Sequence, residues 1–430
     1  SETESLTYRE LQQKTNRVAH FLQEQGVGPE VIVGIYLTRS LEFVVCLVGL
    51  IKSGGAFLPL DPNHPKDRKE YMIKDSQVPF IITSKKFVDS LPEGNFRVLL
   101  VEEFFQSLES YPIQTPDHGL KSGNMSYLFY TSGSTGQPKG VIMTHTYQDK
   151  QSKETKKFPI KGEKVLLRSS TGFTLILLET FSPIKAGGEI VVVPKDQEKD
   201  ASWMLENIRE QKIETLNMVP SMLSFLLQEG LETCTSLKKV YTVGERLPVS
   251  VQREFFRKLP DAKLFVFYGC TEAPAATFRE VKKDEDYGDR IILGTPNFNK
   301  KVYLLDEFGV PVPVGVTGEI FVGGKVSRGY IHNERLTQER FTQDPFLNRK
   351  GARMYQTGDL GRYLPDGSLE YIGRTDFQVQ IRGIRIELGE IESCLNAHEH
   401  ISDAVVIAKE NLGGQTIIVA YYTLTGMKAP

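Results

Sequence analysis

Tyr130-Thr-Ser-Gly-Ser-Thr-Gly-Gln-Pro-Lys-Gly140 follows the apolar residues 127–129, a pattern that predicts a buried strand leading into a glycine-rich loop. The glycines let backbone N–H groups come close to an anion, while the hydroxyls and Lys139 add donors and a positive charge. This chemistry suits a polyphosphate. The loop is not a Walker A motif, because that motif ends in Gly-Lys-Ser/Thr, whereas Lys139 lies between Pro138 and Gly140. On composition alone, a flexible surface loop is an equal alternative.

The composition is that of a globular protein with more than one structural unit. With 430 residues the chain exceeds one ordinary core, so two or three units are expected. The net charge of −2 gives no reason to expect a nucleic-acid partner. The most apolar stretch, residues 41–51, is too short to span a bilayer, so no membrane partner is expected. The four cysteines form no CxxC pair, which argues against a zinc site and for a reducing, cytoplasmic location.

Strand and helix patterns alternate over most of the chain. Apolar residues recur at helical spacing in residues 8–25 and 43–51, and strands are expected at 31–37, 80–83, 98–101, 165–167, 190–193, 240–243 and 264–268. This order predicts largely parallel sheets with helices on their faces. From Ile291 the pattern changes to short strands and turns, at 302–305 and 320–322, which predicts a small antiparallel, barrel-like unit.

The glycine-rich loop resembles the phosphate loop of the adenylate-forming enzymes, in particular that of the adenylation domains of nonribosomal peptide synthetases. Six further segments resemble the same family, in the same order and over nearly the whole chain. They are Leu6-Thr-Tyr-Arg-Glu-Leu11, Lys52-Ser-Gly-Gly-Ala-Phe-Leu-Pro-Leu-Asp61, Tyr268-Gly-Cys-Thr-Glu272, residues 318–330, Tyr355-Gln-Thr-Gly-Asp-Leu360 and residues 373–390. One such motif is weak evidence, but the whole series in order leaves little room for coincidence.

The resemblance implies an α/β fold with a hinge. A large adenylate-forming core of two αβ-sheet subdomains plus a small β-barrel subdomain is expected at residues 1–375, and a partial α+β C-terminal lid at 376–430. Asp376 takes the hinge position, and the lid is expected to contain a helix near 388–397 and strands near 404–409 and 416–423. The final motif of the family carries a catalytic lysine, and Lys428 does not match it. The end of the chain fits either an inserted domain or a truncation, and we expect this segment alone to adenylate weakly.

The resemblance also implies the chemistry. A carboxylate attacks the α-phosphorus of ATP and pyrophosphate leaves, so the protein must hold two anions together and neutralise the charge that develops. The implied catalytic residues are Thr131, Lys139, Thr271, Glu272 and Arg374, and Glu272 is the implied Mg2+ ligand. The implied ATP contacts are Thr131, Ser132, Gly133, Ser134, Thr135, Gly136 and Lys139 at the β- and γ-phosphates, Thr271 at the α-phosphate, Asp359 at the ribose, Arg374 at the ribose and phosphate, and Tyr268 at adenine, together with Tyr371.

Each of these residues also has a purely structural interpretation. Asp359 is typical of a turn, and Glu272 could cap a helix that begins at the next residue. Tyr268 could be a core aromatic residue, and Arg374 could form an ordinary surface ion pair with Asp376. Taken singly, these interpretations are favoured, whereas the joint order of the motifs favours the functional ones.

One departure from the family carries information about the substrate. Amino-acid-activating members have an aspartate that pairs with the α-ammonium group, and Thr174 stands there in Gly172-Phe-Thr-Leu-Ile-Leu-Leu-Glu179. Burying an unpaired charge costs several kcal/mol, so the acid is expected to lack a charged α-amine. The alternative is that Glu179 compensates, although a glutamate at this position is common in ordinary members. The implied substrate pocket is mostly apolar and consists of Phe173, Thr174, Leu175, Leu178, Asn217, Tyr241, Val243, Gly244, Phe267, Gly269, Ala275 and Ala276.

These features favour a branched aliphatic α-keto acid, with α-hydroxy, simple branched and aryl acids as alternatives. The keto-acid-selecting adenylation domains of depsipeptide synthetases are most similar, and in them a ketoreductase domain is inserted in the lid. The implied partners are such a ketoreductase and a carrier (thiolation) domain whose phosphopantetheine thiol accepts the acyl group. One alternative function is a stand-alone acyl- or aryl-CoA ligase, which the synthetase-like sequence of residues 373–390 disfavours. The other is a non-catalytic scaffold module, which the presence of Lys139, Glu272 and Asp359 disfavours.

Overall fold

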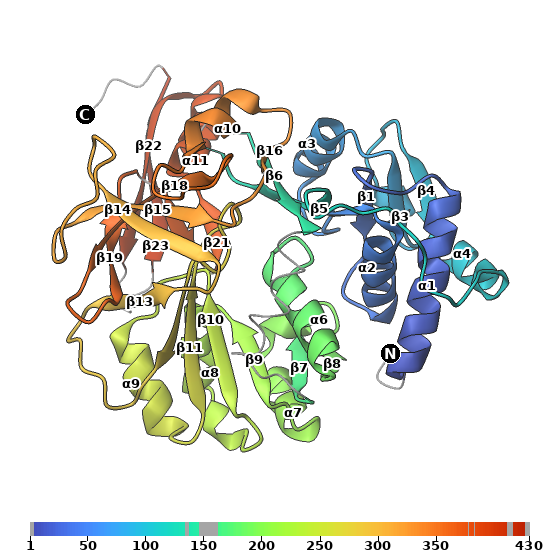
Figure 1. Cartoon of the computed structure of the whole chain (residues 1–430), viewed down its shortest axis with the longest axis horizontal. Coiled ribbons are helices and arrows are strands. Elements are labelled where there is room, and N and C mark those ends of the chain that lie inside the picture. Colours follow the sequence, from blue (N-terminus) through green and yellow to red (C-terminus); the bar gives the residue numbers. More distant parts are fainter. Residues whose placement is uncertain are drawn as a thin grey trace.

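The computed structural model describes residues 4–133, 137–145, 162–376, 378–381, 383–410 and 416–425. These residues form two large β-sheets with helices packed on their faces, and two small two-stranded sheets in the C-terminal segment (Figure 1). None of the described helices combines the length and the apolar composition that crossing a bilayer would require.

The first large sheet joins segments from both ends of the chain. In the described residues its strand order is β16-β6-β5-β2-β1-β3-β4. The strands are β1 (Ile32–Tyr36), β2 (Ala56–Pro59), β3 (Phe80–Thr83), β4 (Arg97–Leu100), β5 (Met125–Thr131), β6 (Lys139–Thr144) and β16 (Gly329–Tyr330). Strands β1 to β5 pair in parallel, β6 returns antiparallel to β5, and β16 pairs antiparallel with β6 at the edge. The predicted parallel sheet is confirmed, and its last strand comes from a distant part of the sequence.

The helices against this sheet begin and end where the sequence provides caps. Helix α1 (Tyr8–Glu24) starts with a reciprocal capping box between Thr7 and Glu10. Helix α2 (Leu41–Ser53) starts after Ser40, whose hydroxyl accepts from the N–H of Phe43, and stops at Gly54, which has a φ of 94°. Both helices confirm the predicted ones within a few residues. Two shorter helices, α3 (Lys66–Ser76) and α4 (Val101–Ser107), complete this part.

The second large sheet has a parallel and an antiparallel part. In the described residues the strand order is β14-β15-β18-β19-β13-β12-β11-β10-β9-β7-β8, and β17 (Phe341–Gln343) pairs with β18. The parallel strands are β7 (Lys164–Leu167), β8 (Glu189–Val192), β9 (Thr215–Met218), β10 (Lys239–Val243) and β11 (Lys263–Tyr268). The helices between them are α6 (Leu175–Ala186), α7 (Ala201–Glu210), α8 (Pro220–Gln228) and α9 (Val249–Lys258).

The antiparallel unit predicted from residue 291 onward is present. It contains β13 (Ile291–Pro296), β14 (Lys300–Leu305), β15 (Gly318–Gly324), β18 (Arg353–Tyr363) and β19 (Leu369–Arg374), and β12 (Thr277–Val281) connects it to the parallel part. Its strands therefore form one hydrogen-bonded series with the second sheet. A short helix, α10 (Glu334–Arg340), lies beside β16 and β17 in sequence.

The C-terminal segment folds on a smaller scale, as the sequence predicted. A hairpin of β20 (Val379–Ile381) and β21 (Ile384–Ile386) is followed by α11 (Leu388–Asn396) and by a second hairpin of β22 (Ile401–Glu410) and β23 (Thr416–Leu424). Figure 1 shows this red segment next to the antiparallel strands β18 and β19. We refer to β20–β21 below as the lid hairpin.

Candidate active site

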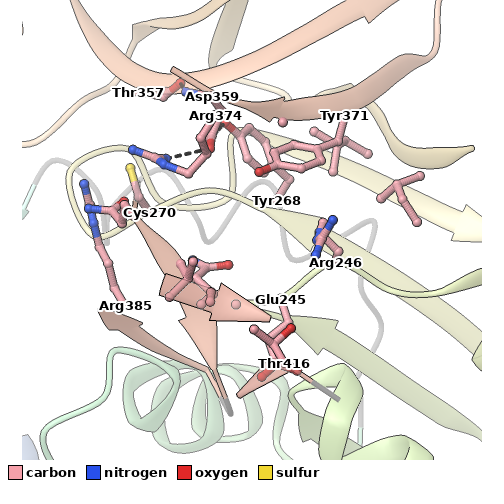
Figure 2. A pocket seen from close by; sticks show the side chains of 18 of the residues that line it. Glu245, Arg246, Tyr268, Cys270, Thr357, Asp359, Tyr371, Arg374, Arg385 and Thr416 are labelled. Atoms are coloured by element: carbon pink, nitrogen blue, oxygen red, sulfur yellow. Dashed lines mark hydrogen bonds and ion pairs between the residues drawn. The ribbon is translucent and has the colours of Figure 1, made fainter. Parts of the chain in front are cut away.

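A cavity of about 580 Å³ lies between the second sheet and the C-terminal segment. Its walls come from the ends of β10 and β11, from β13, β18 and β19, and from the lid hairpin and β22. Four of the predicted nucleotide-binding residues line it, namely Tyr268, Asp359, Tyr371 and Arg374, and Figure 2 shows how they face the cavity. The structure therefore brings together Tyr268, Asp359 and Arg374, which the sequence placed in three separate motifs, and adds Tyr371 to them.

Asp359 is held by two neighbours at the top of this cavity. Its Oδ2 accepts a hydrogen bond from the hydroxyl of Tyr268 at 2.7 Å, and its Oδ1 accepts from Arg374 at 2.6 Å. Burial raises the pKa of Asp359, while the guanidinium of Arg374 opposes that rise. A carboxylate offers about four acceptor positions, so each oxygen keeps capacity for one more donor, as two ribose hydroxyls would need.

The backbone beside Asp359 explains why a glycine precedes it. Gly358 has a φ of 76°, and a Cβ at this position would lie 2.7 Å from a guanidinium nitrogen of Arg374. Only glycine combines this backbone conformation with so close an approach. Asp359 lies in β18 rather than in an isolated turn, so the turn interpretation of this residue is not supported. Arg374 also pairs with Asp376 at 2.6 Å, as the structural alternative proposed, yet the same guanidinium reaches Asp359.

Glu272 is fully buried and lies in a second cluster of polar side chains. Its Oε1 accepts from the hydroxyl of Tyr330 at 2.9 Å, and its Oε2 pairs with Arg385 of the lid hairpin at 3.1 Å. Burial alone would raise the pKa of Glu272, but Arg385 and Lys139 outweigh burial and hold the pKa below its usual value. Residues 271–275 form no helix, so Glu272 does not cap one.

The ends of the predicted phosphate loop lie close to this cluster. Thr131 ends β5 and Lys139 begins β6, and the two residues are paired in the antiparallel ladder. The Thr131 hydroxyl oxygen is buried without a hydrogen-bond partner, and a Cβ on Gly133 would lie 2.0 Å from the carbonyl oxygen of Gln137. The Ser132 hydroxyl donates to the carbonyl oxygen of Arg385 at 2.7 Å. Ser134, Thr135 and Gly136 lie outside the described residues.

The residues present fit a metal ion that arrives with a nucleotide. Within the described ranges no group of three or more His, Cys, Asp or Glu side chains could hold a metal ion by itself. Mg2+ is often bound by one or two carboxylates together with substrate phosphates, so a single carboxylate beside a phosphate loop suffices. Glu272 and the unpaired Thr131 hydroxyl provide that combination.

The predicted acid-binding residues lie at the start of α6 and near the carboxyl ends of three parallel strands. Thr174 immediately precedes α6 and its side chain makes no cap hydrogen bond, while Asn217 lies on β9 opposite Tyr241 on β10. Both amide atoms of Asn217 are buried without a partner. A Cβ on Gly244 would lie 3.4 Å from the ring of Phe173. Three residues of the predicted set, Gly244, Phe267 and Gly269, line the cavity of about 580 Å³. The other members do not line it; they are Phe173, Thr174, Leu175, Leu178, Asn217, Tyr241, Val243, Ala275 and Ala276.

Glu179 is sealed inside the protein. Its oxygens accept from the backbone N–H groups of Arg168 and Ser169 at 3.0 and 2.9 Å, and from the Ser169 hydroxyl at 2.9 Å. The side chain is fully buried. Glu179 therefore has a structural role, since it accepts hydrogen bonds from residues 168 and 169. This disfavours the alternative that it pairs with a substrate ammonium group.

The burial of Glu179 predicts a pH-dependent stability difference. Burial raises its pKa from 4.5 to about 7, so its contribution to stability is complete below pH 4.5 and is lost as the pH rises through 7. The loss amounts to about 3 kcal/mol. We expect Glu179→Gln, which lacks this titration, to gain stability relative to the wild type between pH 5 and pH 8, measured as thermal midpoints. Glu109→Gln, which alters an exposed carboxylate paired with Arg17, should show no such trend.

Three residues at the site were not predicted from the sequence. Arg385 and Tyr330 lie within motifs that the sequence singled out, but neither was assigned a contact with Glu272. Glu245 accepts from the N–H of Gly383 in the lid hairpin at 2.7 Å. For Arg385 the available sequence signal was the alternation Ile384-Arg-Ile386, because a charged residue between two apolar residues of a strand faces the opposite side from them.

Comparison with known proteins places this geometry in context. Residues 1–331 match the family model described as AMP-binding enzyme. The chain is 37% identical over 420 residues to tyrocidine synthase 3 of Brevibacillus parabrevis, covering 97% of this chain and 6% of that protein. It is 35% identical over 421 residues to bacitracin synthase 1 of Bacillus licheniformis, covering 97% of this chain and 8% of that protein. The chain thus spans less than a tenth of the length of these two relatives.

Solved structures show the same fold. NpsA-ThdA, an artificially fused adenylation–PCP di-domain NRPS from Klebsiella oxytoca, superposes with a TM-score of 0.86 at 22% identity, covering 98% of this chain and 84% of that one. Holo-PA1221, an NRPS protein containing adenylation and PCP domains, also gives a TM-score of 0.86, at 24% identity, covering 98% of this chain and 72% of that one.

Proposed function

Because the chain belongs to the AMP-binding enzyme family, we propose that it converts a branched aliphatic α-keto acid to its acyl adenylate. It is an adenylate-forming enzyme that uses ATP with Mg2+ to activate a carboxylic acid. The family alone leaves the acid and the acyl acceptor open.

Among the described residues, Thr174 and Glu179 carry the assignment of the acid. Thr174 offers a hydroxyl where an α-ammonium group would require a carboxylate, and Glu179 has both oxygens engaged by Arg168 and Ser169. A buried ammonium group without a counter-charge binds several kcal/mol more weakly, and about 1.4 kcal/mol corresponds to a tenfold change in affinity. An acid without an α-amine avoids this cost.

The remaining pocket residues support a branched chain with a polar atom next to the carboxylate. Leu175 and Ala276 are buried and apolar, and they suit an aliphatic side chain. Asn217 is 1% exposed and its amide is unpaired, so its N–H groups can donate a hydrogen bond to a keto oxygen. These properties favour a keto acid over a simple branched acid, which would leave the amide unsatisfied.

The described side chains suit the two anions that react, the substrate carboxylate and the triphosphate of ATP. We assign Lys139 and the Thr131 hydroxyl to the terminal phosphates, Thr271 to the α-phosphate, and Glu272 to the metal ion. A Mg2+ ion held by Glu272 would supply positive charge that offsets the negative charge of the phosphates. Around the cavity, Asp359 and Arg374 would fix the ribose, while Tyr268 and Tyr371 would enclose the base.

We also propose the partners and the location of the enzyme. The acyl group would pass to the phosphopantetheine thiol of a carrier domain, after rotation of the segment beyond Asp376, and a ketoreductase in the same polypeptide would act on the loaded keto group. The adenylation–PCP arrangement named for both similar structures supports the carrier domain. Cys46, Cys234, Cys270 and Cys394 are all free thiols, which supports the reducing cytoplasm.

ATP–pyrophosphate exchange tests the choice of acid. We expect the α-keto analogue of leucine to support exchange at least about a hundredfold better than leucine, because Thr174 offers the ammonium group no counter-charge. The α-hydroxy analogue and the deaminated acid complete the panel, since they separate the contribution of the keto oxygen from that of the missing amine. Exchange that is fastest with leucine would overturn the assignment.

A further inference from the structure

We propose that Arg385 is a positioning residue that occupies the place of the metal ion at Glu272 when the lid hairpin is docked, so that the hairpin and magnesium nucleotide exclude each other. This inference rests on the proposed role of Glu272 as the metal ligand. It does not depend on which acid the enzyme activates.

Polar contacts of Gly383 and Arg385 dock the lid hairpin on the core. The N–H of Gly383 donates to Glu245 at 2.7 Å, the carbonyl oxygen of Arg385 accepts from Ser132 at 2.7 Å, and the guanidinium of Arg385 pairs with Glu272 at 3.1 Å. Gly383 also packs so closely that a Cβ would lie 2.6 Å from Val219. The hairpin is therefore seated by backbone and side chain together, at several points of the core.

Charge explains why Arg385 matters most among these contacts. The Glu272 side chain is fully buried, and a buried carboxylate requires a cation beside it. In this structure the guanidinium of Arg385 forms the ion pair with Glu272, and Lys139 adds a further positive charge. Arg385 is itself largely buried, with 15% of its side chain exposed. Figure 2 shows the Arg385 side chain extending toward Cys270, which precedes Glu272 by two residues in the sequence. A divalent cation at the same oxygen would face the guanidinium directly, and two cations cannot share that position.

The phosphate loop is engaged by the same hairpin. Ser132, a predicted phosphate donor, donates its hydroxyl to the backbone of Arg385 instead. Docking of one residue thus occupies a phosphate donor and the metal carboxylate at once. Magnesium nucleotide must displace Arg385 to bind, and departure of the nucleotide products leaves Glu272 to be neutralised by Arg385 again.

Nucleotide affinity tests this exclusion. We would titrate the chain with a non-hydrolysable ATP analogue plus Mg2+ in a calorimeter, without any acid present. Because a competitor is removed, Arg385→Met should bind the analogue at least about tenfold more tightly than the wild type. Arg385→Lys should fall between them, because an ammonium keeps the charge but lacks the planar fork. Arg362→Met, which removes an arginine paired with Glu370 at 2.6 Å on the neighbouring strand, should leave the affinity unchanged.

Hydrogen exchange on the wild type provides a second readout. The backbone amides of Val379–Ile381 and Ile384–Ile386 should be protected in the free chain, and their exchange should rise when the magnesium analogue binds. In Arg385→Met the exchange should already be fast without ligand. Unchanged or weaker binding by Arg385→Met, or unchanged protection on nucleotide binding, would overturn the proposal. Since no acid is used, a wrong keto-acid assignment would leave both results as expected.

Discussion

Glu272→Gln should lower the rate of ATP–pyrophosphate exchange by about a hundredfold to a thousandfold, as removal of one preorganised charge from an active site commonly does. The carboxylate is fully buried, it is oriented by Tyr330, and its charge is maintained by Arg385 and Lys139. Glutamine keeps the size but offers a metal ion only a neutral oxygen. The rate would be measured at saturating acid over a range of Mg2+ concentrations.

The matched control for this change lies far from the cavity. Glu254 is a partly exposed carboxylate on α9 that pairs with Arg257, and Glu254→Gln makes the same chemical change in a setting where ion pairs contribute little. It should exchange at the wild-type rate. If Glu272→Gln retained a comparable rate with the same dependence on Mg2+, the assignment of Glu272 to the metal ion would be wrong.

Thr174→Asp should shift the proposed substrate preference of the enzyme from an acid without an amine to an amino acid. Thr174 lies at the start of α6 in a half-buried position, where the helix N-terminus also favours a negative charge. The new carboxylate can pair with an α-ammonium group, so the ratio of exchange rates for leucine over its keto analogue should rise by at least about a hundredfold. Competition between the two acids in one assay measures this ratio directly.

Thr174→Asn separates charge from shape in this experiment. Asparagine has nearly the volume of aspartate but no negative charge, so it should not recruit leucine. An equal gain with both variants would mean that the size of residue 174, rather than its charge, sets the preference. A gain with neither would point to another group as the partner of the amine.

The sequence predicted the fold well wherever local signals are strong. Strand β3 was predicted residue for residue, and α1 and α2 were predicted within a few residues, because capping residues and helical periodicity lie within the segments themselves. The C-terminal helix and hairpin were predicted equally well. The edge position of β16 was not predicted, because two residues carry no periodicity and the partner strand lies far away in sequence.

The same distinction between local signals and long-range contacts applies to the candidate active site. Motif order indicated that Tyr268, Asp359 and Arg374 belong together, and the structure brings them within hydrogen-bonding distance. The contacts of Arg385 could not be derived, because Ser132 and Glu272 lie 253 and 113 residues away from it. Such contacts depend on how the lid hairpin docks, which no local pattern encodes.

The edge strand β16 limits where the chain can be shortened without disrupting the first sheet. Tyr330 contributes its backbone to the first sheet, opposite Val141, and its hydroxyl to Glu272 beside the second sheet. A shortened version ending before Gly329 would leave β6 as an exposed edge, which invites aggregation, and would also remove a contact from the catalytic cluster. The residues before Gly329 therefore cannot form the complete first sheet by themselves, although they supply β1 to β6.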